Sequence, residues 1–513
     1  MSLSANSLNS APATKKTQNH PCAGGRATST AGYGWLGFAL LLFLLQAVPY
    51  LSHRWVTDES WYAGPAYSVA HGDGMRDPAI GPNDLENHFD ARPPGTALVI
   101  AAFFKLLGAG QVTARLGSVL AGLGIVFLTY RLTRDVLGEE GAAIATLLAA
   151  TDNLVVLTSR SARPEALTAM FILLSMLAMK QYAKRGSTRW ALFSGLLIAM
   201  GTMFHITLLG YIVSFGLLAI VIDRMGGRFP LRGGILYTLG FFAGLAPFAV
   251  WILTAPLGRA GFRQEYMGRA VHDSLLTKFI REGHRYSDIF GFNMIHSHGL
   301  ETIPVRLPIP LFFLAATFLL WKFRRSWFYL ELLLLVPSVL WLIYTVNKSS
   351  RYIAIIAPLF AMAIGAAVAA TRKHRLLHRA VVAVACLVIV AQVGANFILL
   401  NAARKADYNK VGAELRSVVP PGETAYGTIT FWLAFRGRPF ISYERTDPWM
   451  AANQYHTRYF ILGDRTMSEG WTGDSDFYTE LNQHLAEITA RSELVGHFPD
   501  PYYGDLKVYR LDN

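Results

Sequence analysis

The sequence predicts an α-helical membrane protein that crosses the bilayer many times and carries a small α/β domain at its C-terminal end. Apolar runs of membrane-spanning length recur up to Leu400, and the patterns beyond them are shorter and more polar. Only 16% of the 513 residues are charged, whereas about one quarter are charged in a soluble domain. The net charge of +13 fits the excess of Lys and Arg in cytoplasmic loops, so nucleic acid is not expected as a partner.

The N-terminal residues predict a tail followed by a membrane anchor. Residues 1–33 are rich in small polar residues and contain basic but no acidic side chains, which is typical of a disordered cytoplasmic tail. The run Gly34–Leu51 is expected to be an uncleaved anchor, because a signal peptide would need a clean cleavage site. The two cysteines, Cys22 in the tail and Cys386 in an apolar run, are not expected to pair.

About eleven spans of roughly 20 residues each are expected. The run Trp190–Ile222 is too long for one crossing and predicts a hairpin with His205 at its tip, and a turn is expected at Gly138. The short run after Pro94 predicts an interfacial helix instead. The basic clusters then fall on one side, which predicts a cytoplasmic N-terminus and an outer C-terminus. The remaining expected spans are Gly34–Leu51, Ala114–Leu132, Gly141–Thr158, Ala166–Met179, Ile235–Leu253, Pro308–Trp321, Trp327–Val346, Tyr352–Ala370 and Ala380–Leu400.

These patterns divide the chain into the tail 1–33, a transmembrane domain 34–400 and an outer α/β domain 401–513. Two outer loops, 53–113 and 256–306, interrupt the transmembrane domain. Helical and strand patterns alternate in the last part, and turns separate them. The helices expected there are Arg404–Val418 and Asp474–Ile488, and the strands are Thr424–Ile429, Arg458–Leu462 and Lys507–Leu511.

Acidic residues stand where two spans reach the outer surface. Asp58 and Glu59 directly follow the first span among aromatic residues, and Glu165 follows a later span on the same side. A carboxylate at membrane level is costly and is often functional, and here it could act as a general base toward an acceptor hydroxyl. A charge that only solvates a helix end explains the same spacing equally well.

Cationic residues stand near the same level of the membrane. Arg92 precedes two prolines that hold the backbone extended, and a guanidinium fork is well suited to phosphate. Arg351 and Tyr352 open a span on the outer side and place a cation beside a phenol. The alternative for Arg92 is contact with lipid headgroups, and for Tyr352 it is an ordinary aromatic anchor at the interface.

Metal ligands are a weaker expectation. Glu86, His88 and Asp90 alternate, so an extended strand would point all three the same way. Triplets of this kind in polar loops are usually just solvated, and that interpretation is favoured. His205 could face the same cavity as the acids, although a packing role is favoured for it too.

Taken together, these motifs resemble the GT-C glycosyltransferases. Asp-Glu follows the first span, a loop then ends in a basic residue and Pro-Pro, and Ala-Arg-Pro-acid follows the third span. The resemblance is greatest to the bacterial lipid A aminoarabinose transferases (ArnT) and extends more distantly to protein O-mannosyltransferases. It covers about Gly34 to Met179 and returns from Arg351 to Pro358.

The resemblance implies an inverting transfer of a sugar from a polyprenyl-phosphate donor to an envelope acceptor at the periplasmic face of a bacterial inner membrane. The acceptor would be lipid A, another glycan or a protein. The catalytic residues would be Asp58, Glu59 and Glu165: Asp58 occupies the position of the catalytic aspartate, Glu59 follows it as in the family, and Glu165 replaces a second aspartate. No cofactor is implied with certainty.

The resemblance also implies how the donor phosphate is bound. Arg92 stands where a lysine usually binds it, and Tyr352, next to Arg351, resembles a phosphate-contacting tyrosine. Arg269 in the long loop is similar to a further phosphate-binding arginine. Where the aminoarabinose enzymes have a metal-binding glutamate, this chain has Ala91, so a divalent metal stays an open alternative.

A transporter or flippase of a lipid-linked sugar is the alternative function. Transporters place substrate groups near the bilayer midplane and often contain inverted repeats. Here the notable charges lie at the outer ends of the spans, and no internal repeat is evident in the sequence. A non-catalytic envelope scaffold is a third possibility, which a substitution at Asp58 would separate from an enzyme.

Overall fold

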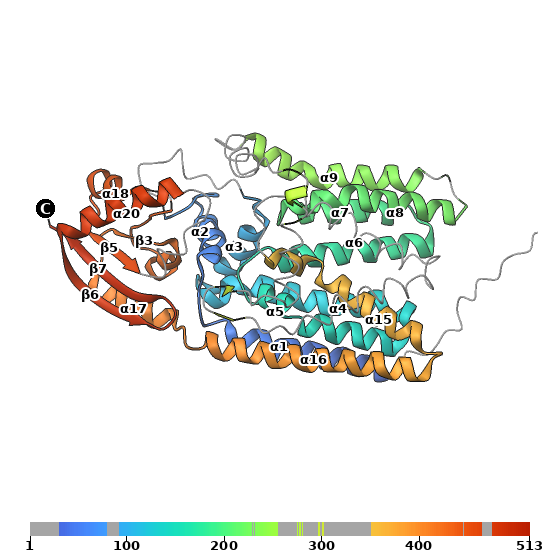
Figure 1. Ribbon diagram of the computed structural model, residues 1–513. Coiled ribbons are helices and arrows are strands. Elements are labelled where there is room, and N and C mark those ends of the chain that lie inside the picture. Colours follow the sequence, from blue (N-terminus) through green and yellow to red (C-terminus); the bar gives the residue numbers. More distant parts are fainter. Residues whose placement is uncertain are drawn as a thin grey trace, which may run out of the picture.

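The computed structural model shows a helical bundle with a small sheet at one end (Figure 1). It describes residues 30–79, 92–227, 229, 231–254, 274, 276–278, 280, 296–297, 300–301, 350–444, 446–463 and 475–512. Six stretches of the described chain are long and apolar enough to cross a membrane: Gly32–Tyr50, Gln111–Thr151, Glu165–Arg185, Ile206–Met225, Arg232–Thr254 and Arg375–Val418. The protein is therefore a multi-pass membrane protein.

The helices of the bundle lie close to the expected spans. Two of those spans, Pro308–Trp321 and Trp327–Val346, fall outside the described residues. The helices are α1 (Thr30–Ala47), α4 (Gln111–Thr151), α5 (Asn153–Ser159), α6 (Glu165–Arg185), α7 (Arg189–Thr202), α8 (Tyr211–Met225), α9 (Arg232–Thr254), α15 (Ala357–Thr371) and α16 (Arg375–Ala403).

Two expected turns are found where the sequence places them. Gly138 has φ 73° and divides α4 into two helical parts, and glycine adopts this conformation at little cost. The run Trp190–Ile222 forms the two helices α7 and α8, and His205 lies between them, just before the short 3₁₀ helix η2 (Ile206–Gly210).

Two shorter helices lie between the bundle and the sheet (Figure 1). They are α2 (Thr57–His71) and α3 (Gly95–Leu107), and they pack against each other. The short run expected as an interfacial helix is α3. By contrast, α2 lies in a segment that was expected to be a loop, and the structure shows it helical through Pro65. The loop 53–113 is therefore largely helical in its described part.

The C-terminal part contains a mixed five-stranded sheet in the order β4-β3-β5-β7-β6. Strand β3 pairs in parallel with β4 and β5, whereas β7 pairs antiparallel with β5 and β6. The expected strands correspond to β3, β5 and β7, and β4 and β6 were not expected. The elements are α17 (Tyr408–Val418), β3 (Ala425–Gly427), η5 (Ile429–Phe435), β4 (Phe440–Ser442), α18 (Pro448–Tyr455), β5 (Tyr459–Gly463), α20 (Ser475–Ala490), β6 (Ser492–Asp500) and β7 (Gly504–Leu511).

The sheet is joined to the bundle through the segment that leads into α2. The Tyr503 hydroxyl accepts a hydrogen bond from the Trp55 N–H at 2.8 Å and donates one to the Trp55 carbonyl at 3.0 Å. The Arg54 N–H donates to the Ala406 carbonyl at 3.0 Å. Residues of α2, α3, α17 and η5 share one hydrophobic cluster around Trp55. The C-terminal part therefore fixes the backbone where α2 begins.

Candidate active site

The two acids that follow the first span begin α2 and have different surroundings. The Asp58 side chain is 44% exposed, whereas that of Glu59 is 1% exposed. Carboxylates are favoured in the first turn of a helix because the backbone N–H groups there lack partners. The Val56 N–H donates to Glu59 Oε2 at 3.3 Å and thereby closes the start of the helix. Asp58 is the acid that can meet a ligand.

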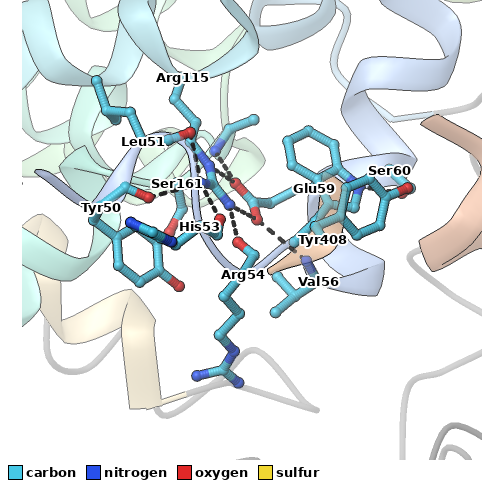
Figure 2. A network of polar contacts seen from close by, with 12 residues as sticks. Tyr50, Leu51, His53, Arg54, Val56, Glu59, Ser60, Arg115, Ser161 and Tyr408 are labelled. Carbon is cyan, nitrogen blue, oxygen red and sulfur yellow. Dashed lines mark hydrogen bonds and ion pairs between the residues drawn. The ribbon is translucent and has the colours of Figure 1, made fainter. Parts of the chain in front are cut away.

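Glu59 is held in a buried network that Arg115 organises (Figure 2). Arg115 Nε donates to Glu59 Oε1 and Arg115 Nη2 donates to Glu59 Oε2, both at 2.7 Å. The Ala162 N–H donates to Glu59 Oε1 at 2.8 Å. Four bonds thus converge on this carboxylate, counting the one from Val56. Removing one partner of such a buried pair typically costs about 3–5 kcal/mol.

Arg115 also forms hydrogen bonds with the backbone of the segment between α1 and α2. Its guanidinium donates to the carbonyls of Tyr50, Leu51 and His53 at 3.2, 3.1 and 2.8 Å, and to that of Arg54. Arg115 was not predicted as a site residue. Its position in the apolar run Ala114–Leu132 could have indicated a role, because ionisable groups are rare and costly there.

A second ion-pair chain supports Asp58 from the start of α6. Arg163 donates through Nη1 to Asp58 Oδ2, and through Nη2 to Glu165 Oε1 at 2.6 Å. Its Nε also lies 3.0 and 3.2 Å from the two Glu165 oxygens. Burial alone would lower the pKa of Arg163, but the carboxylates of Asp58 and Glu165 outweigh that effect and raise the pKa well above its usual value. Arg163 therefore stays positively charged between the carboxylates of Asp58 and Glu165.

Glu165 faces inward and contacts Arg163. Its side chain is 0% exposed. The structure therefore brings the predicted acids Asp58 and Glu165 together through one arginine, while Glu59 belongs to the separate network around Arg115.

Arg92 lies on the aromatic face of α2. Its guanidinium carbon is 4.5 Å from the centre of the Trp61 ring, and its Nη1 donates to the Trp61 carbonyl at 3.4 Å. The segment is docked by Gly95, whose N–H donates to the Met203 carbonyl at 2.6 Å. A Cβ atom at position 95 would lie 2.6 Å from that same oxygen. Only glycine fits this approach, so Arg92 is held close to the chain that precedes His205.

The charges of several candidate site residues act on the phenol of Tyr62. Burial raises the pKa of the Tyr62 phenol well above its usual value, the positive charges of Arg92 and Arg163 act against this, and Glu165 and Tyr352 act with it. Tyr352, in the 3₁₀ helix η4 (Ser350–Ile355), packs its ring against that of His205 with 4.7 Å between the ring centres. The charges of the predicted residues Arg92, Glu165 and Tyr352 therefore all act on one phenol of α2.

Comparisons with known proteins bear on the fold that holds these residues. Residues 91–253 match the family described as dolichyl-phosphate-mannose-protein mannosyltransferase. The structure resembles that of ArnT from Cupriavidus metallidurans bound to undecaprenyl phosphate, with a TM-score of 0.62, 13% identity and coverage of 94% of this chain and 98% of that one. This chain therefore shares its fold with ArnT. The archaeal oligosaccharyltransferase AglB from Archaeoglobus fulgidus has the same fold, with a TM-score of 0.53, 13% identity and coverage of 93% and 74%.

Sequence relatives of this chain are distant and matched only in part. A polyprenol-phosphate-mannose–protein mannosyltransferase of Mycolicibacterium smegmatis is 26% identical over 230 residues, which cover 38% of this chain and 43% of that protein. A mannosyltransferase of Bacillus subtilis, YycA, is 25% identical over 188 residues, covering 36% and 27%. The match thus spans less than half the length of these curated relatives.

Other predicted site residues lie outside the described structure. Arg269 and the triplet Glu86, His88 and Asp90 are among them, and the Arg351 side chain is not described although its backbone belongs to η4. Among the described residues, no group of three or more His, Cys, Asp or Glu side chains could hold a metal ion. The described site therefore consists of one exposed carboxylate, the cations Arg163 and Arg92, and the rings of Tyr62, Tyr352 and His205.

Proposed function

We propose that this chain is an inverting glycosyltransferase that moves a sugar from a polyprenyl-phosphate donor to a cell-envelope acceptor, which is lipid A, another glycan or a protein. The observation that carries the proposal is the partly exposed Asp58 carboxylate, which accepts a hydrogen bond from Arg163. The fold shared with ArnT bound to undecaprenyl phosphate supports a lipid-linked donor.

The geometry suggests a division of labour between the acid and the cations. Asp58 accepts the proton of the acceptor hydroxyl as its oxygen attacks the anomeric carbon of the sugar. The bond between that carbon and the phosphate oxygen breaks, and the polyprenyl phosphate leaves with an additional negative charge. Arg92 stabilises this charge, together with Tyr352. A phosphate is already a good leaving group, so no protonating acid is required. Where the acceptor is itself a phosphate, Asp58 orients it instead.

The buried acids act through arginines in this proposal. Glu165 fixes Arg163, which in turn orients Asp58. Glu59 fixes Arg115 and with it the turn that leads into α2. All three acids were predicted to be catalytic. The burial of Glu59 and Glu165 instead favours positioning roles for these two.

The proposal places the site on the periplasmic side of the inner membrane. The distribution of Lys and Arg supports a cytoplasmic N-terminus, with the site and the C-terminal part on the outer side. The donor lipid would reach the site from the bilayer, between apolar helices.

The test is mass spectrometry of envelope lipids and glycans from cells that carry the wild-type protein or Asp58→Asn. We expect the variant to lose a species that differs by one sugar unit, because the amide cannot accept the proton. Asp73→Asn, an exposed acid just beyond the same helix, is the matched control and should leave that species unchanged. Identical spectra with Asp58→Asn present at normal levels would overturn the proposal in favour of transport or scaffolding.

A further inference from the structure

A second site of interest lies where the start of α4 meets the C-terminal part. A cavity of about 300 Å³ opens there between α4, α17 and η5. Its volume is at the lower end of the range for small-molecule sites, about 300–1,000 Å³. The polar residues around it are Gln111, Tyr408, Asn409, Arg416 and Arg436. None of these is part of the group around Asp58.

The cavity carries positive charge that its described lining does not balance. Arg416 and Arg436 line it, and none of the lining residues that the structure describes is acidic. Burial and then the positive charges of Arg438 and Arg436 lower the pKa of the Arg416 guanidinium. Arg416 Nη1 donates to the Ala434 carbonyl at 2.6 Å, and Arg436 Nη1 donates to the Leu433 carbonyl at 3.1 Å. A guanidinium has five N–H donors, so each fork retains donors for a ligand.

The buried amide of Gln111 gives an independent indication of a ligand. Its side chain is 6% exposed and lines the cavity, and neither Nε2 nor Oε1 has a hydrogen-bond partner within the described structure. Burying an unpaired amide costs about 1–3 kcal/mol by protein mutational data, so such a group calls for an explanation. Gln111 is also the first residue of α4, whose N-cap Gly110 supplies no side-chain cap. The backbone N–H groups of a helix start favour an anion.

We propose that this cavity binds a phosphate group, with Arg416 and Arg436 as the cationic contacts and the Gln111 amide as a neutral donor. The phosphate would be carried by a phospholipid headgroup or would be a free phosphate. The cavity lining contains none of the residues of the proposed donor site, and Arg115, which pairs with Glu59, follows Gln111 by one turn of α4. The proposal does not depend on the proposed transfer reaction.

The test is equilibrium binding to the purified full-length chain. Inorganic phosphate is titrated in one arm by calorimetry in detergent. In the other, native mass spectrometry compares retention of phosphatidylglycerol and phosphatidylcholine after release from mixed nanodiscs. We expect saturable binding in at least one arm, weakened at least about tenfold in Arg416→Gln and in Arg436→Gln, because each removes a charge-assisted contact. Gln111→Glu should abolish binding through repulsion of the anion.

The control is Lys410→Gln, which removes the same charge from α17 at an exposed position outside the cavity lining. It should bind as the wild type does, and so should Arg92→Gln, which alters the proposed donor site. Binding in the phosphate arm alone identifies a free ligand, and selective retention of phosphatidylglycerol identifies a lipid. Unchanged affinity in both the Arg436→Gln and the Gln111→Glu variants, or no binding in either arm, overturns the proposal.

Discussion

The guanidinium of Arg163 joins two carboxylates of different exposure. Asp58 faces solvent, whereas Glu165 is buried on the other side of the arginine. A buried arginine without an acidic partner would be costly. The ion pair with Asp58 would also be weak if the Arg163 guanidinium could rotate freely. The bidentate contact with Glu165 fixes the guanidinium plane and thereby the direction from which it approaches Asp58.

Substitution of Glu165 tests this positioning role. We expect Glu165→Gln to lower kcat at least about tenfold with a smaller change in donor KM, because Arg163 loses the charge that orients it. Glu165→Asp keeps the charge and should restore part of kcat. Steady-state transfer kinetics with a defined lipid-linked donor provide the measurement. Equal loss in both variants, or a change confined to KM, would argue against a role through Arg163.

The pair Arg115–Glu59 makes a separate prediction about stability. Arg115→Met leaves a buried, uncompensated carboxylate and should lower the free energy of unfolding by about 3–5 kcal/mol. The double variant Arg115→Met, Glu59→Met removes both charges and should recover part of that loss. Thermal unfolding of the detergent-solubilised protein, followed by tryptophan fluorescence, compares the three proteins. An unchanged midpoint in the single variant would contradict the network in Figure 2.

At the level of elements, α3 determines where Arg92 lies. The helix begins at Gly95, and its first N–H is bound to Met203, so the residues before it cannot shift independently of the turn after α7. The donor-binding arginine of the proposal is therefore tied to the chain that carries His205, although more than a hundred residues separate the two.

Gly95→Ala should move Arg92 without removing any functional group. The added Cβ would meet the Met203 carbonyl at 2.6 Å, so the segment must shift. We expect a several-fold rise in donor KM, measured as above. Gly394→Ala in α16 is the matched control, because nothing lies within 4 Å of a Cβ there. It should leave the kinetics unchanged, and helix propensity makes it neutral or slightly stabilising. Equal effects of the two substitutions would show that the close contact at Gly95 is unimportant.

The elements also show which features local sequence can predict. The turn at Gly138 and the helices flanking His205 follow from apolar run length and turn residues. Helix α2 was missed because Gly64 and Pro65 oppose it locally, whereas packing against α3 and η5 outweighs that preference. Strand β6 was missed for a similar reason, since it contains Gly496 and Pro499 and lies at the sheet edge, where both are tolerated.

The exposed residues of the candidate site could be predicted from the sequence, whereas the buried residues that hold them in place could not. Asp58 and Arg92 stand in recognisable local settings, which made them candidates from sequence alone. Their partners are distant in the chain: Arg163 lies 105 residues from Asp58, and Arg115 lies 56 residues from Glu59. Pairings at such separations depend on how helices pack, and hydrophobic periodicity carries no information about them. For the same reason, the cavity around Gln111 was not predicted.

At the level of the whole molecule, segments from the N-terminal and C-terminal parts of the sequence meet beside the site, where Trp55 and Tyr503 are hydrogen-bonded. Figure 1 shows the sheet beside α2 and α3, at one end of the bundle. The sheet supports the start of α2 from one side, and the helices α4 to α6 support it from the other through Arg115 and Arg163. Asp58 therefore lies at the junction of both parts of the molecule.

The bond between Tyr503 and Trp55 has a consequence for how the protein is made. The two residues are 448 positions apart, and the ribosome adds about 5–20 residues per second. The first helices are therefore synthesised tens of seconds before the tyrosine that fixes Trp55. During that time the turn before α2 lacks its final support. A chain that ended before Tyr503 would insert its helices without this support, so the completed site requires translation past that residue.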